Sequence, residues 1–176
     1  IPATCAILGC MKTTIAVDIG GTHMRAACYP LNSQDALHIK RTTTRRNNQK
    51  IEDRLTELVQ AVWPDSNDVL SVGAAAPGPL NPKTGLVLSS PNIPEWRDFP
   101  LQAHLENHFH VPVRIGNDAN LAALGEWKYG AGVGVENLVY LTISTGIGGG
   151  VIMDGQLLVG ADGLAGELGH ITVIPE

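Results

Sequence analysis

The spacing of apolar residues predicts strands interleaved with a few short helices. Apolar or β-branched runs, typical of strands, occupy residues 13–19, 23–29, 36–43, 69–76, 111–115, 138–143 and 151–153. Apolar residues at helical spacing occupy 51–62, 100–109 and the segment from Asn117 through Trp127. Between residues 77 and 94, five prolines and two glycines predict an irregular surface segment of the kind that presents binding groups.

One arrangement of elements occurs twice along the chain. A strand, a glycine turn and a returning strand are predicted at 13–29 and again at 138–153, where Gly146–Gly150 is the turn. This repeat predicts a duplicated domain whose second copy stops early. We therefore expect a first domain at residues 11–130 and the incomplete start of a second at 131–176. Met11 resembles a natural start, so residues 1–10 are interpreted as a leader or an added segment.

The charge distribution excludes several functional classes. The 12 Lys and Arg residues and 17 Asp and Glu residues give a net charge of −5, and no Lys or Arg follows Lys128. This acidic balance argues against nucleic-acid binding, which relies on basic side chains. The basic cluster of Lys40, Arg41, Arg45, Arg46 and Lys50 is interpreted as a solvated loop after a strand. No apolar run approaches the roughly 20 residues of a membrane span.

The cysteine count indicates a reducing compartment. The chain has three cysteines, Cys5, Cys10 and Cys28, which form no Cys-x-x-Cys pair. An odd number without such a pair fits a reduced cytoplasmic protein better than a disulfide scaffold.

The first glycine turn, Asp18-Ile19-Gly20-Gly21-Thr22, is a candidate phosphate site. Glycines let the backbone approach a ligand and direct N–H groups toward phosphate oxygens. Asp18, at the end of the strand, is suited to holding Mg²⁺ through water. A plain hairpin turn explains the same residues, and no Gly-Lys-Ser/Thr follows as in a P-loop.

The second glycine turn offers a similar backbone. It begins Ser144-Thr145-Gly146 and lies in the segment that has no Lys or Arg, so a phosphate there must be bound by backbone amides and a metal ion. A tight turn is the alternative. Two such turns at matching places in a duplicated fold suit a polyphosphate chain.

Three further groups are candidates for chemistry. Asn117-Asp118 lies where a strand meets a helix, which predicts an N-cap, a general base, or both on neighbouring residues. Glu167 and His170 supply a carboxylate and an imidazole that can receive hydroxyl groups or a metal. An exposed surface position is the alternative for each of these two.

Taken together, these motifs resemble the ROK family of sugar kinases and repressors. The resemblance rests on Asp18 to Thr22, on Ser90-Pro91-Asn92 and on Asn117-Asp118-Ala119-Asn120. Most specific is the long glycine pattern from Ile143 through Val151, then Gly160, then Gly166-Glu167-Leu168-Gly169-His170. It covers Met11 to the C-terminus and is strongest to the bacterial-type glucokinases of the family.

The resemblance implies an α/β, actin-like fold of the ribonuclease-H and hexokinase type, a mixed sheet flanked by helices, in two domains that close over ATP and sugar. It implies Asp118 as the base, and Asn92, Asn117, Glu167 and His170 as residues that bind sugar hydroxyls. The nucleotide's phosphates would meet Asp18, Gly20, Gly21, Thr22, Ser144, Thr145 and Gly146. His170 also ligates zinc in the family, but the cysteine motif that accompanies it is not in this chain.

The leading hypothesis is therefore phosphotransfer from ATP, with Mg²⁺, to a hexose, most simply glucose to glucose 6-phosphate. N-acetylmannosamine, N-acetylglucosamine, mannose and fructose are alternative substrates, and polyphosphate is an alternative donor. A sugar-binding repressor is a competing hypothesis, disfavoured because only 17 residues precede Asp18, and a non-catalytic hexose-binding fragment is a third. The chain alone is expected to have little turnover. A homo-oligomer is typical of the family.

Overall fold

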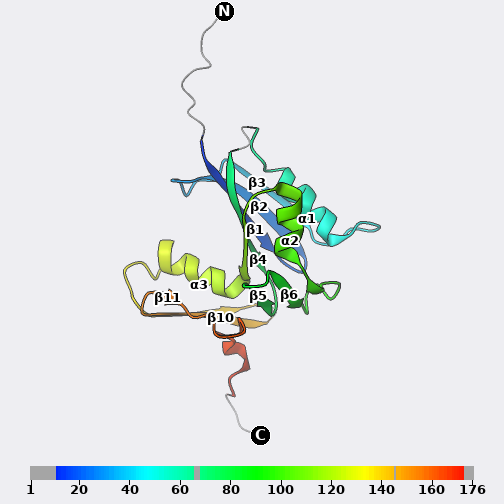
Figure 1. The fold of residues 1–176 in the computed structure, drawn as a ribbon. Coiled ribbons are helices and arrows are strands. Elements are labelled where there is room, and N and C mark those ends of the chain that lie inside the picture. The colour runs from blue at the N-terminus through cyan, green and yellow to red at the C-terminus, as the bar shows by residue number, and fades with distance from the viewer. Residues whose placement is uncertain (1–10, 66–67, 145, 173–176) are drawn as a thin grey trace, which may run out of the picture. The chain divides into compact units, whose positions relative to one another are not determined.

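The computed structural model describes residues 11–65, 68–144 and 146–172, in which the chain forms two compact units (Figure 1). The first unit comprises residues up to Ala74 together with Pro100–Ile115, and the second comprises Ala75–Phe99 together with the residues from Gly116 onward. The leader predicted at residues 1–10 lies outside the described residues. The division into domains at 11–130 and 131–176 stays a prediction.

Three sheets and four helical segments make up the described residues. The strands are β1 (Thr13–Ile19), β2 (His23–Pro30), β3 (His38–Thr43), β4 (Val69–Ala76), β5 (Leu80–Asn81), β6 (Leu86–Ser89), β7 (Arg97–Phe99), β8 (Val113–Asn117), β9 (Leu138–Ile143), β10 (Ile147–Met153) and β11 (Gln156–Leu157). The helices are α1 (Ile51–Gln60), α2 (Leu101–Phe109), α3 (Asp118–Tyr129) and the 3₁₀ helix η1 (Leu168–His170). The sheet orders are β3-β2-β1-β4-β8, β11-β10-β9 and β5-β6-β7.

The first unit is organised around β1, whose side chains alternate between a buried and an open face. Ile15, Val17 and Ile19 are buried, while Ala16 and Asp18 are exposed, as the two-residue period of a strand requires. Helix α1 packs against β2, β3 and α2, and places Leu55, Leu58 and Val59 in the core (Figure 1). β1 and β2 pair as an antiparallel hairpin around Gly20-Gly21, as predicted.

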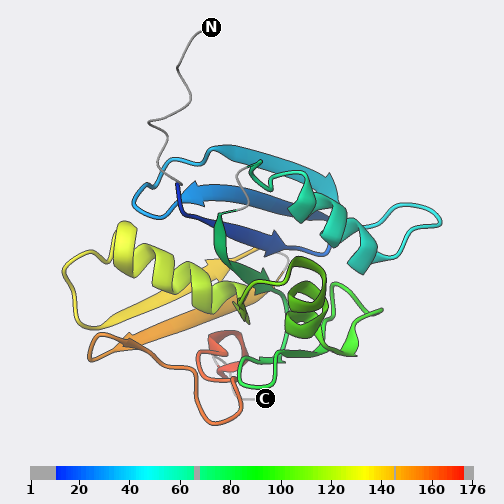
Figure 2. The same cartoon turned by 45° about the horizontal axis from the view of Figure 1, so that its top comes forward.

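The second unit is built on the antiparallel β11-β10-β9 sheet, which carries α3 on one face and η1 on the other (Figure 2). A Cβ atom at Gly148 would lie 3.2 Å from Cβ of Ala119, and one at Gly150 would lie 2.6 Å from Cβ of Ala123. The missing side chains therefore let α3 approach the strand closely. A Cβ at Gly149, on the opposite face, would lie 2.8 Å from Cδ1 of Leu168 in η1.

This packing corrects the extent of the second glycine turn. Gly148, Gly149 and Gly150 were predicted in a turn, but they lie in β10 and pair with β9. Their lack of side chains serves helix packing rather than chain reversal. β9 ends at Ile143 and β10 begins at Ile147, so the connection between the two strands is shorter than predicted.

The segment from 77 to 94 is also more regular than predicted. β5 and β6 within it pair antiparallel, and β6 pairs in turn with β7. Leu80 and Val87 are buried, so these short strands are held by packing that the surrounding prolines obscure in the sequence. No helix in the described part of the chain is both long and apolar enough to cross a bilayer.

Candidate active site

The junction of β8 and α3 holds the candidate base. Asn117 is the N-cap of α3, and its Oδ1 accepts a hydrogen bond from the Asn120 backbone N–H at 3.1 Å. Asp118 is the first residue of the helix, and its Oδ1 accepts from the Ala119 backbone N–H at 2.9 Å. Of the two roles predicted for Asn117-Asp118, the N-cap is therefore held by Asn117. The carboxylate of Asp118 lies in the first turn of α3, at the positive end of the helix dipole.

The segment that carries Asn92 is tied to this junction through Gly78. Nδ2 of Asn117 donates to the Gly78 carbonyl at 3.5 Å. Gly78 has a φ of +87°, and a Cβ there would lie 3.1 Å from Cα of Ser90, so only glycine lets these two backbones meet. The Ile93 N–H donates to the Ser90 carbonyl and hydroxyl, and Ile93 is buried. Asn92 therefore lies between two anchored residues.

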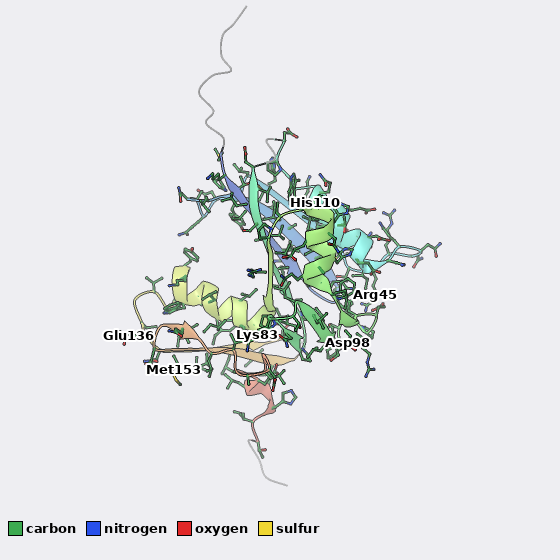
Figure 3. The ribbon with its side chains drawn as sticks, viewed as in Figure 1. Arg45, Lys83, Asp98, His110, Glu136 and Met153 are labelled. Carbon is green, nitrogen blue, oxygen red and sulfur yellow. The ribbon has the colours of Figure 1, made fainter. Side chains whose placement is uncertain are left out.

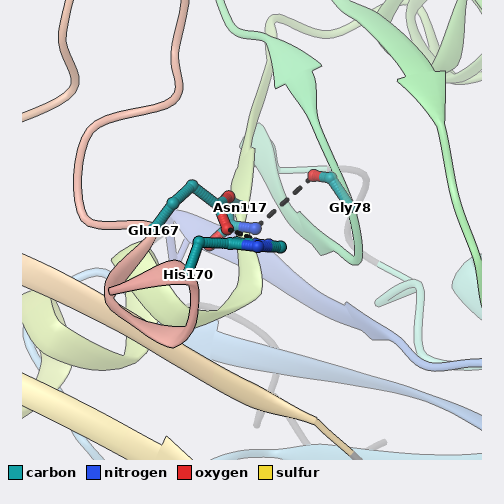
Figure 4. Close-up of polar contacts among 4 residues, drawn as sticks. All are labelled: Gly78, Asn117, Glu167 and His170. Carbon is teal, nitrogen blue, oxygen red and sulfur yellow. Dashed lines mark hydrogen bonds and ion pairs between the residues drawn. The ribbon is translucent and has the colours of Figure 1, made fainter. Parts of the chain in front are cut away.

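The loop that carries Glu167 and His170 lies against the first turn of α3. A Cβ at Gly166, whose φ is +87°, would lie 3.4 Å from Oδ1 of Asn120. Nε2 of His170 is 4.0 Å from Oε2 of Glu167, and the two side chains are 85% and 45% exposed, respectively. Figure 4 shows both beside Asn117, whose amide reaches Gly78. These contacts within the second unit tie to the first turn of α3 the segments that carry the predicted sugar-binding residues: Asn92, Asn117, Asp118, Glu167 and His170.

In the first unit, the Gly20–Thr22 turn has its carbonyls fixed on one side. The carbonyls of Gly20 and Thr22 accept from the Thr44 hydroxyl and backbone N–H at 2.5 and 2.9 Å, and Gly21 accepts from Arg45 at 3.0 Å. In a trans peptide the carbonyl and the following N–H point in opposite directions. The N–H groups of Gly21 and Thr22 therefore point away from residues 44 and 45, as a phosphate nest requires.

The second turn is closed by a hydrogen bond from the Ser144 N–H to the Gly146 carbonyl at 2.9 Å. A Cβ at Gly146 would meet nothing within 4 Å, so its backbone is open to a ligand. Thr145 lies outside the described residues. The role of this turn in binding phosphate stays a prediction.

The sequence patterns assigned neither Arg45 nor Arg54 to a site, but Arg45 binds the first glycine turn and Arg54 binds the end of β3. Arg45, labelled in Figure 3, is exposed and lies in the basic cluster interpreted as a solvated loop. Its guanidinium nevertheless donates a hydrogen bond to the Gly21 carbonyl. Arg54 is 5% exposed and donates to the carbonyl and hydroxyl of Thr43 and to side chains of Thr42 and Gln49. The sequence could have indicated that Arg54 is buried, because Arg54 lies on the apolar face of the 51–62 helix.

The described residues contain no group of three or more His, Cys, Asp and Glu side chains arranged to hold a metal ion. His170 and Glu167 supply at most two ligands, so the zinc site of the family is not complete in these residues. Cys28 is buried in β2, and burial raises the pKa of its thiol, partly offset by a hydrogen bond with Thr13. Cys28 is therefore a core residue rather than a ligand.

Comparison with known proteins extends these observations. The sequence profile described as "ROK family" matches residues 14–176. The chain belongs to the ROK family. It is 39% identical over 174 residues to a glucokinase of Halalkalibacterium halodurans, covering 92% of this chain and 50% of the relative. The chain thus spans about half the length of the curated relatives it matches.

Solved structures of the family share its fold. The structure of a ROK glucokinase from Streptomyces griseus in complex with glucose and AMPPNP has a TM-score of 0.82 and 38% identity, covering 93% of this chain and 51% of that one. The actin-like α/β fold predicted from the motifs is thereby confirmed. Repressors also match: the xylose repressor of Caldicellulosiruptor bescii is 41% identical over 105 residues, 60% of this chain and 26% of the repressor.

Proposed function

We propose that this chain provides the hexose-binding and catalytic half of an ATP-dependent sugar kinase whose substrate is glucose. The observation that carries the proposal is the convergence on the first turn of α3. Asn117 and Asp118 lie there, the Asn92 segment is tied to it through Gly78, and Gly166 packs against it. Glucokinases at 36–39% identity over 92–94% of this chain support glucose as the substrate.

Asp118 is the proposed general base. Its carboxylate takes the proton of the sugar's primary hydroxyl as that oxygen forms a bond to the γ-phosphorus of ATP. The bond between the γ-phosphorus and its bridging oxygen breaks, and ADP leaves with that oxygen. The hydrogen bond from the Ala119 backbone N–H holds the Asp118 carboxylate in one orientation, so the base is already positioned when the sugar binds.

The other side chains orient the sugar. Amides, a carboxylate and an imidazole supply both donors and acceptors, which together suit a ring of hydroxyl groups. We assign this task to Asn92, Asn117, Glu167 and His170. The exposure of Glu167 and His170 leaves both able to meet a ligand. Selection among hexoses then depends on how these groups match each hydroxyl.

The glycine turns are the proposed phosphate contacts. The outward N–H groups of Gly21 and Thr22 suit phosphate oxygens, and the Ser144–Gly146 turn is a further proposed contact. Asp18 would hold Mg²⁺ through water rather than bind a phosphate directly. Mg²⁺-ATP, when bound, supplies the transferred phosphoryl group and partly neutralises its charge. No step requires zinc, since His170 is used here as a hydrogen-bonding group.

The test is a coupled assay over a panel of hexoses and donors. The chain is assayed alone and joined to the C-terminal half of a full-length ROK glucokinase. We expect the joined chain to prefer glucose among glucose, mannose, fructose, N-acetylglucosamine and N-acetylmannosamine, and ATP over polyphosphate. The chain alone should show little turnover. A joined chain that folds but phosphorylates no hexose would contradict the proposal.

A sugar-binding protein without catalysis is the second candidate, favoured by the repressors among the relatives. Calorimetric titration with glucose, with and without ATP, separates the two. A kinase requires both ligands to bind the joined chain, whereas binding of sugar alone indicates a sensor. Light scattering on the same samples tests the predicted homo-oligomer, and a cytoplasmic location stays a prediction.

A further inference from the structure

A buried carboxamide lies beside the proposed site. Asn120 is the polar member of the buried set on α3, whose other members are Ala119 and Ala123. It is 6% exposed, and its Oδ1 has no hydrogen-bond partner within the residues that the structure describes. Buried polar atoms are almost always paired, so this oxygen indicates an interaction that is not formed in this conformation.

The surroundings of Asn120 leave few directions for a partner. Its backbone N–H is already donated to the Asn117 cap. On the β10 side, a Cβ at Gly150 would lie 3.2 Å from Cα of Asn120, so that side is closed by backbone. On the loop side, a Cβ at Gly166 would lie 3.4 Å from Oδ1, which puts the Gly166 backbone within about 5 Å of the oxygen. The oxygen therefore faces the loop.

That loop presents suitable donors. The Ala165 N–H donates to the Val159 carbonyl at 3.1 Å, and the Leu168 N–H donates to the Gly166 carbonyl at 2.7 Å. Between them, the N–H groups of Gly166 and Glu167 have no acceptor within the described residues. An unpaired buried acceptor thus lies next to two unpaired backbone donors.

We propose that Asn120 is a positioning residue for Glu167. In solution its Oδ1 accepts a hydrogen bond from the backbone N–H of Gly166 or Glu167, which requires only a small shift of the loop. Asp118 lies two residues before Asn120 on the same helix. The bond therefore fixes the sugar-binding carboxylate relative to the base through one rigid element. The hydrogen bond between Asn120 and the loop does not depend on the proposed function. The expected effect of Asn120 on glucose binding does rest on the proposed function.

Amide hydrogen exchange by NMR tests the loop contact without any ligand. Asn120→Leu removes the acceptor while keeping a side chain of four heavy atoms branched at Cγ, and it should speed exchange at residues 166 and 167 at least tenfold. Gly125→Ala is the matched control on the same helix, because a Cβ there meets nothing within 4 Å. It should leave those amides unchanged. Equal exchange in the wild type and the leucine variant would overturn the proposal.

Asn120→Ser provides a second variant if leucine prevents folding. Its hydroxyl is too short to reach the loop, so the same loss of protection is expected, and unchanged protection overturns the proposal.

A double-mutant cycle then measures the effect on glucose. Calorimetry on the joined chain should show Asn120→Leu weakening glucose binding about tenfold, and Glu167→Ala weakening it further. The double variant should bind no worse than Glu167→Ala alone, because the role of Asn120 is to place that carboxylate. Additive losses would overturn the positioning role. If no variant binds glucose while the exchange result holds, the proposed function fails and the loop contact stands.

Discussion

Gly150→Ala is the substitution whose effect the structure defines most sharply. The added Cβ would lie 2.6 Å from Cβ of Ala123 and 3.1 Å from the Ala119 carbonyl oxygen. Carbon atoms pack at about 3.5–4.0 Å, so the overlap with Cβ of Ala123 is roughly 1 Å. Both contacting atoms are fixed to helix α3. Helix α3 must move away from β10 to admit the methyl group.

The expected cost is about 1–3 kcal/mol, the usual range for overpacking. For a protein of this size 1 kcal/mol shifts Tm by about 2–4 °C, so Tm should fall by roughly 2–12 °C. Gly125→Ala applies the same substitution in the same unit where no atom lies within 4 Å. It should instead stabilise the helix by about 0.4–1 kcal/mol, because alanine loses less backbone entropy than glycine.

Thermal and urea unfolding, followed by circular dichroism, compare the two variants. Adding Ala123→Gly to Gly150→Ala removes the other methyl group of the clash, so the double variant should be more stable than the two single losses predict. If Gly150→Ala and Gly125→Ala shift Tm alike, or if the cycle is additive, the close packing of α3 on the β10 glycines is refuted.

Three more predictions concern Arg54, Leu141 and Cys28. Arg54→Lys should destabilise the first unit by about 1–3 kcal/mol, since lysine cannot satisfy the acceptors around Thr43; unfolding at the wild-type midpoint would contradict this. We also predict that the chain self-associates through β9, the edge strand of its sheet, where Leu141 is 54% exposed. Leu141→Lys should therefore lower the mass measured by light scattering, and an unchanged mass would contradict this prediction. In a chain starting at Met11, Cys28 is the sole cysteine and should resist iodoacetamide at pH 8 until the protein unfolds. Because burial raises the pKa of Cys28 in the folded state, stability should decline as pH rises above the ordinary thiol pKa of about 8.5. Fast native alkylation would contradict this account of the thiol.

The sequence predicted those helices and strands whose local residue pattern matches the burial seen in the structure. β1 was predictable because β-branched residues alternate up to Gly20, and the start of α3 because Asn117 is a strong N-cap. β5 and β6 were missed because they are only two and four residues long and lie among prolines, and because the sequence pattern does not show that Leu80 and Val87 are buried.

The glycines show the same limit within the site. A run of glycines predicts backbone freedom but does not say what approaches it, and at Gly148 and Gly150 the neighbour is a helix. Sequence motifs named Asp118, Asn117, Glu167 and His170, but not the contacts that gather them. Those contacts run through Gly78, Gly166 and Asn120, whose roles depend on close tertiary approach.

Replacement of the proposed base tests the central claim most directly. Asp118→Asn keeps the side-chain shape and an oxygen that can accept from Ala119, but it cannot take a proton from a hydroxyl. Asp154→Asn is the matched control, since Asp154 has a φ of +51°, a conformation that asparagine also adopts readily. The measurement is kcat for glucose phosphorylation by the joined chain, with glucose binding followed by calorimetry. We predict that Asp118→Asn abolishes turnover and leaves glucose binding largely intact, while Asp154→Asn changes neither. Turnover retained in Asp118→Asn would contradict the assignment of Asp118 as the base.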